Sequence, residues 1–288
     1  LPASAAGATA DQPATLAATA PATGIAFSVV IDSLTIAMFT MVTLVGALVH
    51  LFSIDYMADD PKAPRFFALL GLFCFAMLGL VLSNSLPQLF FFWELLGIAA
   101  YLLIAFRHEN RAPATSALKT VLVNRVGDGL FLLGIGLLTV HVGIANLTLY
   151  DSAGTPVLAS AVASTGQTEL LNSQPQSILQ DFTRLAVASD ASSILFHNFG
   201  ISFLGLSWLT WAGLCLFAGA AAKAAQFPLH VWLPDALAGP LPVSALIHAA
   251  TMVAAGVFLV ARVYPILTMD ARLIIAVIGG VTLSSGAL

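Results

Sequence analysis

Long apolar segments alternate with short polar ones along most of the chain, and each apolar segment comes close to the roughly 20 residues that a helix needs to cross a bilayer. Four of these segments follow one another in the first half of the sequence, and three more follow a polar stretch. We therefore expect seven membrane-spanning helices, within residues 27–52, 66–82, 86–106, 114–142, 201 to beyond 228, 243–264 and from 273 onward.

The polar stretches divide the chain into four parts. Residues 1–24 are mostly Ala, Thr, Ser and Pro, a low-complexity composition typical of an exposed loop or tail. Residues 25–142 hold four expected transmembrane helices, and residues 143–200 form a polar extramembrane insertion with a short helix near 178–188. Residues 201–288 hold a broken helix and the transmembrane helices that follow it. The predicted fold class is all-α, a polytopic membrane helix bundle.

Composition supports a membrane protein and excludes several other classes. The chain is 59% hydrophobic and 8% charged, whereas ordinary globular proteins carry about 25% charged residues. The net charge is -4 without a basic patch, so nucleic acid is not an expected partner. The two cysteines lie apart in apolar segments, which indicates neither a disulfide framework nor a metal or iron–sulfur site. The chain starts at Leu1 and ends in an apolar segment, so we expect a piece of a longer protein.

Lys223 is the ionisable residue with the least ordinary surroundings. It lies in a run of Ala and Gly, and its own segment supplies no acid. Prolines interrupt a helix, and an ionisable group in a long apolar segment is costly wherever no water reaches it. We therefore expect a broken helix in which Lys223 acts as a proton switch; the alternative is a lysine that anchors the helix at the membrane edge. The nearby prolines are Pro228, Pro234, Pro240 and Pro242.

Glu94 lies in the apolar segment LFFFWELLGIAAYLL, with no opposite charge within seven residues. A carboxylate at membrane depth must be protonated, paired or hydrated. A proton-binding or ion-pairing role is one interpretation, and a structural carboxylic acid bonded to a neighbouring helix is the other. Trp93, just before it, is interpreted as a packing or interfacial aromatic residue.

The fourth expected helix carries a polar stripe. Thr120, Asn124 and Asp128 recur every four residues and so share one face. Arg125 and Asp128 are three residues apart and can pair directly, either as a functional pair or only to fix helix packing. Lys119 is near the start of this helix, where it can reach the interface by snorkelling.

His248 belongs to a second stripe, with Ser244 and Thr251 at helical spacing. Such a stripe can hold a short chain of waters, and histidine titrates near neutral pH and passes protons through either ring nitrogen. A satisfied packing histidine is the alternative. Haem ligation is not indicated, because no second histidine lies one or two turns away within a span.

These residues lie in motifs that resemble a known family. The motifs are FFWELLGIAAYLLIAF, VNRVGDGLFL, AAAKAAQFPLHVWLPDALAGP and SALIHAATMVAAGVFLVAR, between Phe91 and Arg262. They are similar to the antiporter-like membrane subunits of the proton-pumping NADH:quinone oxidoreductase, respiratory complex I, and most closely to the largest, called L in bacteria and subunit five in mitochondria. The block SALIHAATMV is the most specific of them.

The resemblance implies roles for five residues. Glu94 and Lys223 match the pair thought to exchange partners during pumping, Asp128 and Arg125 look like an ion pair that modulates the lysine, and His248 looks like part of a hydrated proton path. NADH oxidation and quinone reduction are expected in other subunits, so this chain should hold no flavin, iron–sulfur cluster, quinone or other cofactor.

The expected partners are the other membrane subunits of complex I, the lipid bilayer, protons and water, in a bacterial cytoplasmic membrane. Several other functions remain open. A large subunit of a multisubunit sodium/proton antiporter and a membrane-bound hydrogenase subunit share the glutamate and lysine. A purely structural membrane subunit, in which buried charges only lock helices together, and a solute carrier belong to other classes.

Overall fold

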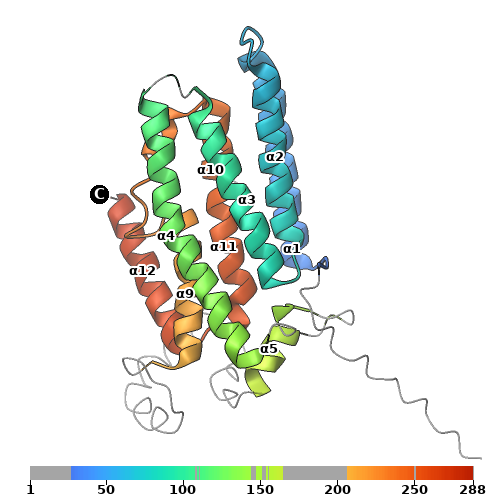
Figure 1. Ribbon diagram of the computed structural model, residues 1–288, viewed down its shortest axis with the longest axis vertical. Coiled ribbons are helices and arrows are strands. Elements are labelled where there is room, and N and C mark those ends of the chain that lie inside the picture. The colour runs from blue at the N-terminus through green and yellow to red at the C-terminus, as the bar shows by residue number, and fades with distance from the viewer. Residues whose placement is uncertain are drawn as a thin grey trace, which may run out of the picture.

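The structure, a computed structural model, describes residues 27–107, 109, 111–143, 147–150, 154, 156–164, 206–249 and 251–287. These residues form an all-α bundle of long helices (Figure 1). The predicted all-α fold class is confirmed for the described residues. Residues 1–24 and the helix expected near 178–188 lie outside them.

The first four helices agree with the expected spans to within a few residues, except that the first starts later and ends later. A polar side chain fixes the start of two of them: the carboxylate of Asp32 accepts the backbone N–H of Thr35 at 2.8 Å, and Ser85 caps the third helix in the same way. Such caps satisfy backbone donors that have no partner within the helix. The helices are α1 (Ser33–Tyr56), α2 (Ala63–Leu82), α3 (Leu86–Ile104) and α4 (Arg111–Val142).

The later part of the chain is more broken. A short helix, η1 (Ala105–Arg107), lies between α3 and α4. The elements after α4 are α5 (Val157–Val162), α9 (Trp208–Lys223), η5 (Asp235–Ala238), α10 (Leu241–Ala249), α11 (Met252–Val263), η6 (Tyr264–Ile266) and α12 (Met269–Ala287). Within the described ranges, six helical stretches are long and apolar enough to cross a membrane: α1, α2, α3 with η1, α4, α10 through η6, and α12. Helix α9 has 16 residues, about 24 Å, which is shorter than a hydrocarbon core of about 30 Å.

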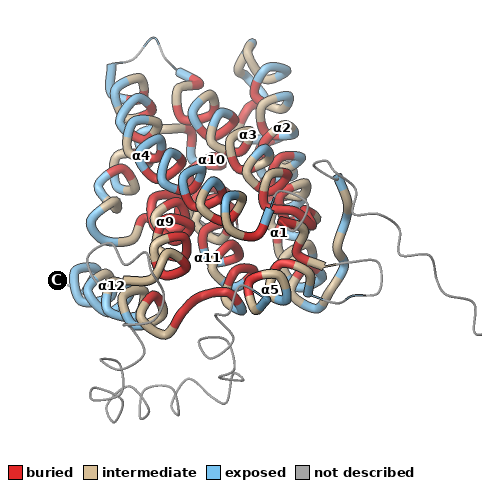
Figure 2. Tube along the Cα trace, turned by 60° about the horizontal axis from the view of Figure 1, so that its bottom comes forward, coloured by how far each residue is buried: buried red, intermediate tan, exposed pale blue. Residues whose placement is uncertain are grey.

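Helix α9 lies among other helices and packs against α4, α11 and α12. Figure 2 shows that its tube is mostly buried, whereas α12 is largely exposed. The contact with α4 is close because both helices present small residues. A Cβ atom added to Gly127 would come within 2.3 Å of the Ala222 side chain, and one added to Gly134 within 3.0 Å of the Ala212 carbonyl oxygen. Small residues allow this approach between membrane helices.

Helix α9 ends at Lys223, five residues before the first proline of the segment. The backbone N–H of Gln226 donates to the Ala221 carbonyl at 2.8 Å, and that of Ala225 donates to Ala222 at 3.3 Å. Ala225 has a positive φ of 49°, so the two bonds form a Schellman motif. The indole N–H of Trp232 also donates to the Ala222 carbonyl, at 2.8 Å. The expected break is therefore present, but backbone capping places it upstream of Pro228.

The sixth expected span is interrupted between α10 and α11, which the sequence pattern did not predict. The hydroxyl of Thr251 donates to the carbonyl of Leu246 at 2.5 Å. A threonine hydroxyl can replace a backbone donor in this way and so make an interruption tolerable at membrane depth. Helix α11 then restarts with the bond from the N–H of Ala255 to the Thr251 carbonyl. His248 lies in the last turn of α10, before this interruption.

Part of the polar insertion packs against one end of the bundle. Helix α5 lies there, beside η6 and the end of α4 (Figure 1). The side chain of Asn84, between α2 and α3, bonds the backbone of Tyr150 twice, to its carbonyl at 2.7 Å and from its N–H at 3.0 Å. Leu149, Leu158 and Val162 are buried.

Candidate functional site

Lys223 is fully buried at the C-terminal end of α9, with 0% of its side chain exposed. Its neighbours along the helix are alanines, which leave room for the side chain. The carbonyls at a helix C-terminus carry partial negative charge and favour a cation there. The alternative of a lysine that anchors α9 at the membrane edge is not what the structure shows, because such a side chain would reach the surface.

The amine of Lys223 faces a carboxylate and an indole. Its Nζ lies 3.7 Å from Oδ1 of Asp128 on α4 and 5.1 Å from the centre of the Trp93 ring on α3. The indole N–H of Trp93 donates to the same Oδ1 atom at 2.7 Å. Among the described residues, Nζ itself makes no hydrogen bond. Asp128 therefore holds a close partner in Trp93 and a looser one in Lys223.

Glu94 pairs with Arg125 across α3 and α4. The Glu94 side chain is 21% exposed and that of Arg125 is 52% exposed, so this pair lies nearer the outside of the bundle than the pair of Lys223 and Asp128. Arg125 and Asp128, which the sequence predicts as a possible pair, are therefore not bonded to each other in this structure. Arg125 extends outward to α3, whereas Asp128 is buried with the lysine.

Lys223 and Glu94 are close but not bonded in this structure. Gly97 lies one helical turn after Glu94, and a Cβ atom there would come within 2.9 Å of Nζ of Lys223. One turn of helix is about 5.4 Å. The lysine therefore lies against α3 one turn from Glu94, while its nearest charged neighbour in this structure is Asp128.

The polar stripe of α4 faces the interior. Thr120, Asn124 and Asp128 are all buried, with relative exposures of 2%, 4% and 5%. The amide of Asn124 donates to the Thr120 carbonyl at 2.9 Å, and its Oδ1 has no partner within the described part of the chain. A buried oxygen without a partner favours an ordered water.

His248 is half-buried, and its Nε2 atom is buried without a hydrogen bond to any described residue. The hydroxyl of Ser244, one turn earlier on α10, is buried and unpaired in the same sense. Two such groups on one face favour bound water. The alternative of a satisfied packing histidine is not supported, because Nε2 lacks a protein partner here.

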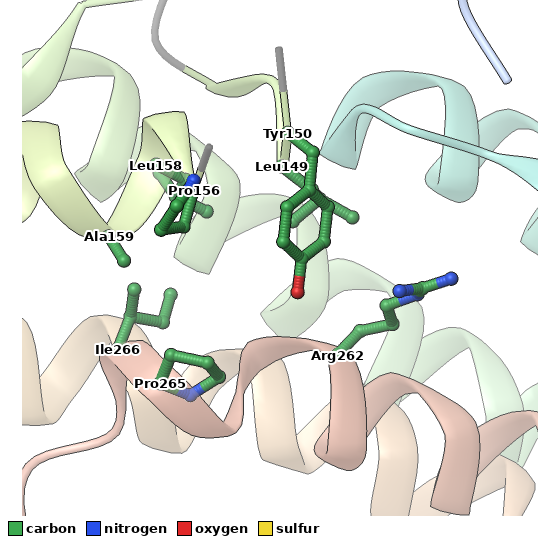
Figure 3. A pocket seen from close by; sticks show the side chains of 8 residues that line it. All are labelled: Leu149, Tyr150, Pro156, Leu158, Ala159, Arg262, Pro265 and Ile266. Carbon is green, nitrogen blue, oxygen red and sulfur yellow. The ribbon is translucent and has the colours of Figure 1, made fainter. Parts of the chain in front are cut away.

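A second charge pair, in which the arginine is buried and the aspartate is partly exposed, lies at the end of the bundle near α5. The guanidinium of Arg262 donates to both carboxylate oxygens of Asp32, at 2.5 and 3.1 Å, and to the hydroxyl of Thr35. Burial raises the pKa of the Asp32 carboxyl, but these bonds lower it more, and it lies below its usual value. Arg262 also lines a pocket of about 20 Å³ beside Tyr150 (Figure 3), room for about one water.

The pair of Asp32 and Arg262 should stabilise the fold. Asp32→Asn keeps the helix cap but leaves the guanidinium, whose side chain is 1% exposed, without a counter-ion. We expect the free energy of unfolding to fall by about 2 kcal/mol. The double variant Asp32→Asn with Arg262→Met should recover part of this loss, because it removes the unpaired charge. Thermal unfolding of the purified protein in detergent measures both, and equal losses in the two variants would contradict the assignment.

Lys119 forms an ion pair with Asp235 of η5 at 2.5 Å, and both side chains are nearly half exposed. The pair links α4 to the segment that follows the broken helix. An exposed pair of this kind contributes about 0 to 1 kcal/mol. Lys119 is therefore a surface residue at the bundle end, consistent with its expected position near the interface.

Sequence reasoning missed the partners of the charged residues more than the residues themselves. The sequence predicts a packing or interfacial role for Trp93, because a tryptophan in an apolar segment carries no signal of the donor role that the structure shows. Arg262 did carry a signal, since an arginine within an expected span requires a partner. Its partner Asp32 is 230 residues away in sequence, which no local pattern reveals.

The described helices and buried charges define a class, the polytopic membrane proteins in which ionisable side chains lie beside a broken helix. Residues 83–288 match the family described as NADH:quinone oxidoreductase/Mrp antiporter, transmembrane. Residues 19–67 match the N-terminal family of NADH-ubiquinone oxidoreductase (complex I) chain 5. The chain belongs to this antiporter-like family, as its motifs predict.

Individual relatives agree. The chain is 41% identical over 266 residues to NADH-quinone oxidoreductase subunit L of Neisseria meningitidis, covering 90% of this chain and 34% of the relative. It is 42% identical over 249 residues to NADH-ubiquinone oxidoreductase chain 5 of Chondrus crispus, covering 86% and 32%. A solved Mrp complex from Dietzia sp. DQ12-45-1b aligns with a TM-score of 0.56 and 26% identity, over 81% of this chain and 20% of that one. The chain spans about a third of the length of these curated relatives.

Proposed function

We propose that this chain is part of a proton-translocating membrane subunit of NADH:quinone oxidoreductase. The observation that carries the proposal is the fully buried Lys223, held 3.7 Å from Asp128 and beside the turn of α3 that bears Glu94. A buried amine is sensitive to the charges around it, because burial disfavours its charged form and a carboxylate favours it. The site can therefore load and release a proton as its partners change.

The mechanism follows from two pairings of the same four groups. In the structure, Lys223 faces Asp128, and Glu94 binds Arg125. In the other pairing, Lys223 turns to Glu94, and Arg125 and Asp128, one turn apart on α4, pair with each other. Each pairing gives the amine one carboxylate, and the amine has none while it moves from one to the other. The lysine keeps its proton beside a carboxylate and releases it during that movement.

Water beside His248 would receive the proton. Its unpaired Nε2 atom and the hydroxyl of Ser244 provide two groups for bound water on one face of α10. In this proposal NADH oxidation and quinone reduction occur in other subunits, this chain binds no cofactor, and its partners are neighbouring membrane subunits, lipid, protons and water in a bacterial cytoplasmic membrane.

Glu94→Gln tests the exchange. The amide keeps the size of the side chain but removes the second charged partner. We expect proton translocation through this path to fall about 10-fold, less than the roughly 100-fold or more that a proton-transfer group contributes, because Asp128 remains as a partner for the lysine. The complex should still assemble, because the glutamine carbonyl can accept a hydrogen bond from Arg125 in place of the carboxylate. The measurement is NADH-driven acidification of vesicles that contain the complete complex. Unchanged translocation would remove Glu94 from the mechanism.

A sodium/proton antiporter subunit is the second candidate, favoured by the alignment with the Mrp complex. The buried lysine and carboxylates suit either function. The two differ in their driving force. A complex I subunit moves protons when NADH is oxidised, whereas an antiporter exchanges protons for sodium ions and needs only an ion gradient. Vesicles given a sodium gradient without NADH distinguish the two.

A further inference from the structure

We propose that Trp93 is a positioning residue that keeps the contact between Lys223 and Asp128 loose, so that the lysine can change partners. The inference rests on the proposed function, since it concerns how that site works. It starts from one atom, Oδ1 of Asp128, which receives the indole N–H at 2.7 Å and lies 3.7 Å from the lysine Nζ.

The two distances show an unequal competition. A charged amine that bonds a carboxylate directly lies about 2.7–2.9 Å from it. The lysine is well beyond that distance, while the indole holds a normal hydrogen bond to the same oxygen. The indole ring also faces the amine, 5.1 Å from its centre, and an aromatic ring attracts a cation. Trp93 therefore stabilises the charged lysine near Asp128 without a direct bond between the two.

The position of Trp93 is fixed. Its side chain is 0% exposed, and the ring of Phe131 on α4 packs edge-on against it, with centroids 5.2 Å apart. It also precedes Glu94 directly on α3. A small movement of this turn of α3 therefore alters the hydrogen bond to Asp128 and the approach of Glu94 together.

The described helices around Lys223 place three charged side chains near its amine. Asp128 faces it from α4, Glu94 acts from α3, and Arg125 acts from α4 at longer range. The part of α11 that packs here is Gly256, against Ala220 and Ala224. The charges of α12, Asp270 and Arg272, lie at its first turn, where Ala271 packs near Gly213 at the other end of α9.

Trp93→Phe removes the indole N–H and keeps an aromatic ring. We expect the lysine to move onto Oδ1 and hold its proton more tightly. The pH at which NADH-driven proton translocation is half-maximal should then move upward by roughly one unit, the size of shift that a hydrogen bond to a charged group produces. Translocation at neutral pH should slow several-fold. Trp93→Met also lacks the indole donor but removes the ring that attracts the amine, so it should shift the profile in the same direction by a smaller amount and serves if the phenylalanine variant does not assemble.

Phe131→Leu is the matched control, because it alters the packing of the indole without touching its N–H. It should leave the pH profile in place. An unmoved profile in both Trp93 variants, or an equal shift in Phe131→Leu, would overturn the role of Trp93. Lys223→Met in the same vesicles separates this failure from that of the proposed function: if that variant loses translocation while the Trp93 variants behave as wild type, only the inference about Trp93 is wrong.

Discussion

Lys223→Met should abolish the share of proton translocation that passes through this chain, while the complex still assembles. Methionine has a similar length and suits an apolar site, and Asp128 keeps its hydrogen bond from the Trp93 indole, so we expect the complex to assemble without the lysine. Positioned proton carriers contribute about 100-fold or more to rate, and we expect a loss of that order along this path. The measurement is the number of protons moved per NADH oxidised in vesicles of the complete complex.

Lys119→Met is the matched control for this experiment. It removes a lysine from the same bundle, but Lys119 is partly exposed and paired with Asp235 at the surface. Translocation should remain near the wild-type value. Full proton pumping in Lys223→Met, with normal assembly, would show that the buried lysine has no transport role and would favour a structural subunit.

Asp128→Asn should give the largest loss of stability. Lys223 is 0% exposed, and Asp128 is its nearest charged partner among the described residues. Removing one partner of a buried pair typically costs about 3–5 kcal/mol, because the other charge is left uncompensated. We expect a fall of about 3 kcal/mol in the free energy of unfolding, together with loss of translocation. Thermal unfolding of the assembled complex and vesicle acidification give the two readouts.

The double variant Lys223→Met with Asp128→Asn separates structure from transport. With both charges gone, the site is neutral and well filled, and replacing a buried pair by apolar groups is often neutral for stability. We therefore expect stability to return while translocation stays lost. If translocation returned along with stability, the two residues would serve only to hold the helices together.

The positions of the first four helices and the identities of the charged residues could be predicted from the sequence because both depend on local pattern, whereas the seven expected spans compare with six in the described residues, because α9 has only 16 residues. A run of about 20 apolar residues is a length criterion, and an ionisable residue within such a run is conspicuous without any contact information. The structure buries Asp128 and Lys223 and leaves Glu94 and His248 partly buried. Their transport roles remain predictions.

Pairing could not be predicted because it depends on contacts across helices. Arg125 and Asp128 are near each other in sequence, so local spacing favoured a bond between them. The structure instead joins Arg125 to Glu94 on α3, because the long arginine side chain reaches the outer face while Asp128 turns inward. At the interruption before α11, the hydroxyl of Thr251 bonds the Leu246 carbonyl, a contact that hydrophobic periodicity does not register.

The end of α9 shows the same limit. Prolines predicted a broken helix, but the break comes before Pro228, where Ala225 takes a positive φ and Trp232 bonds the Ala222 carbonyl. Glycine is the residue usually found at such a position, so an alanine there gives little warning in the sequence. The consequence is functional, because the break places Lys223 at the end of the helix.

The central claim is that Lys223 changes its carboxylate partner during proton transfer. Cryo-electron microscopy of the complete complex, frozen at rest and during NADH oxidation, tests it most directly through the distances from Nζ to Asp128 and to Glu94. We predict one population with the amine beside Asp128 and a second in which it bonds Glu94 while Arg125 turns to Asp128. A single arrangement in both conditions, with Glu94 bound to Arg125 throughout, would contradict the account.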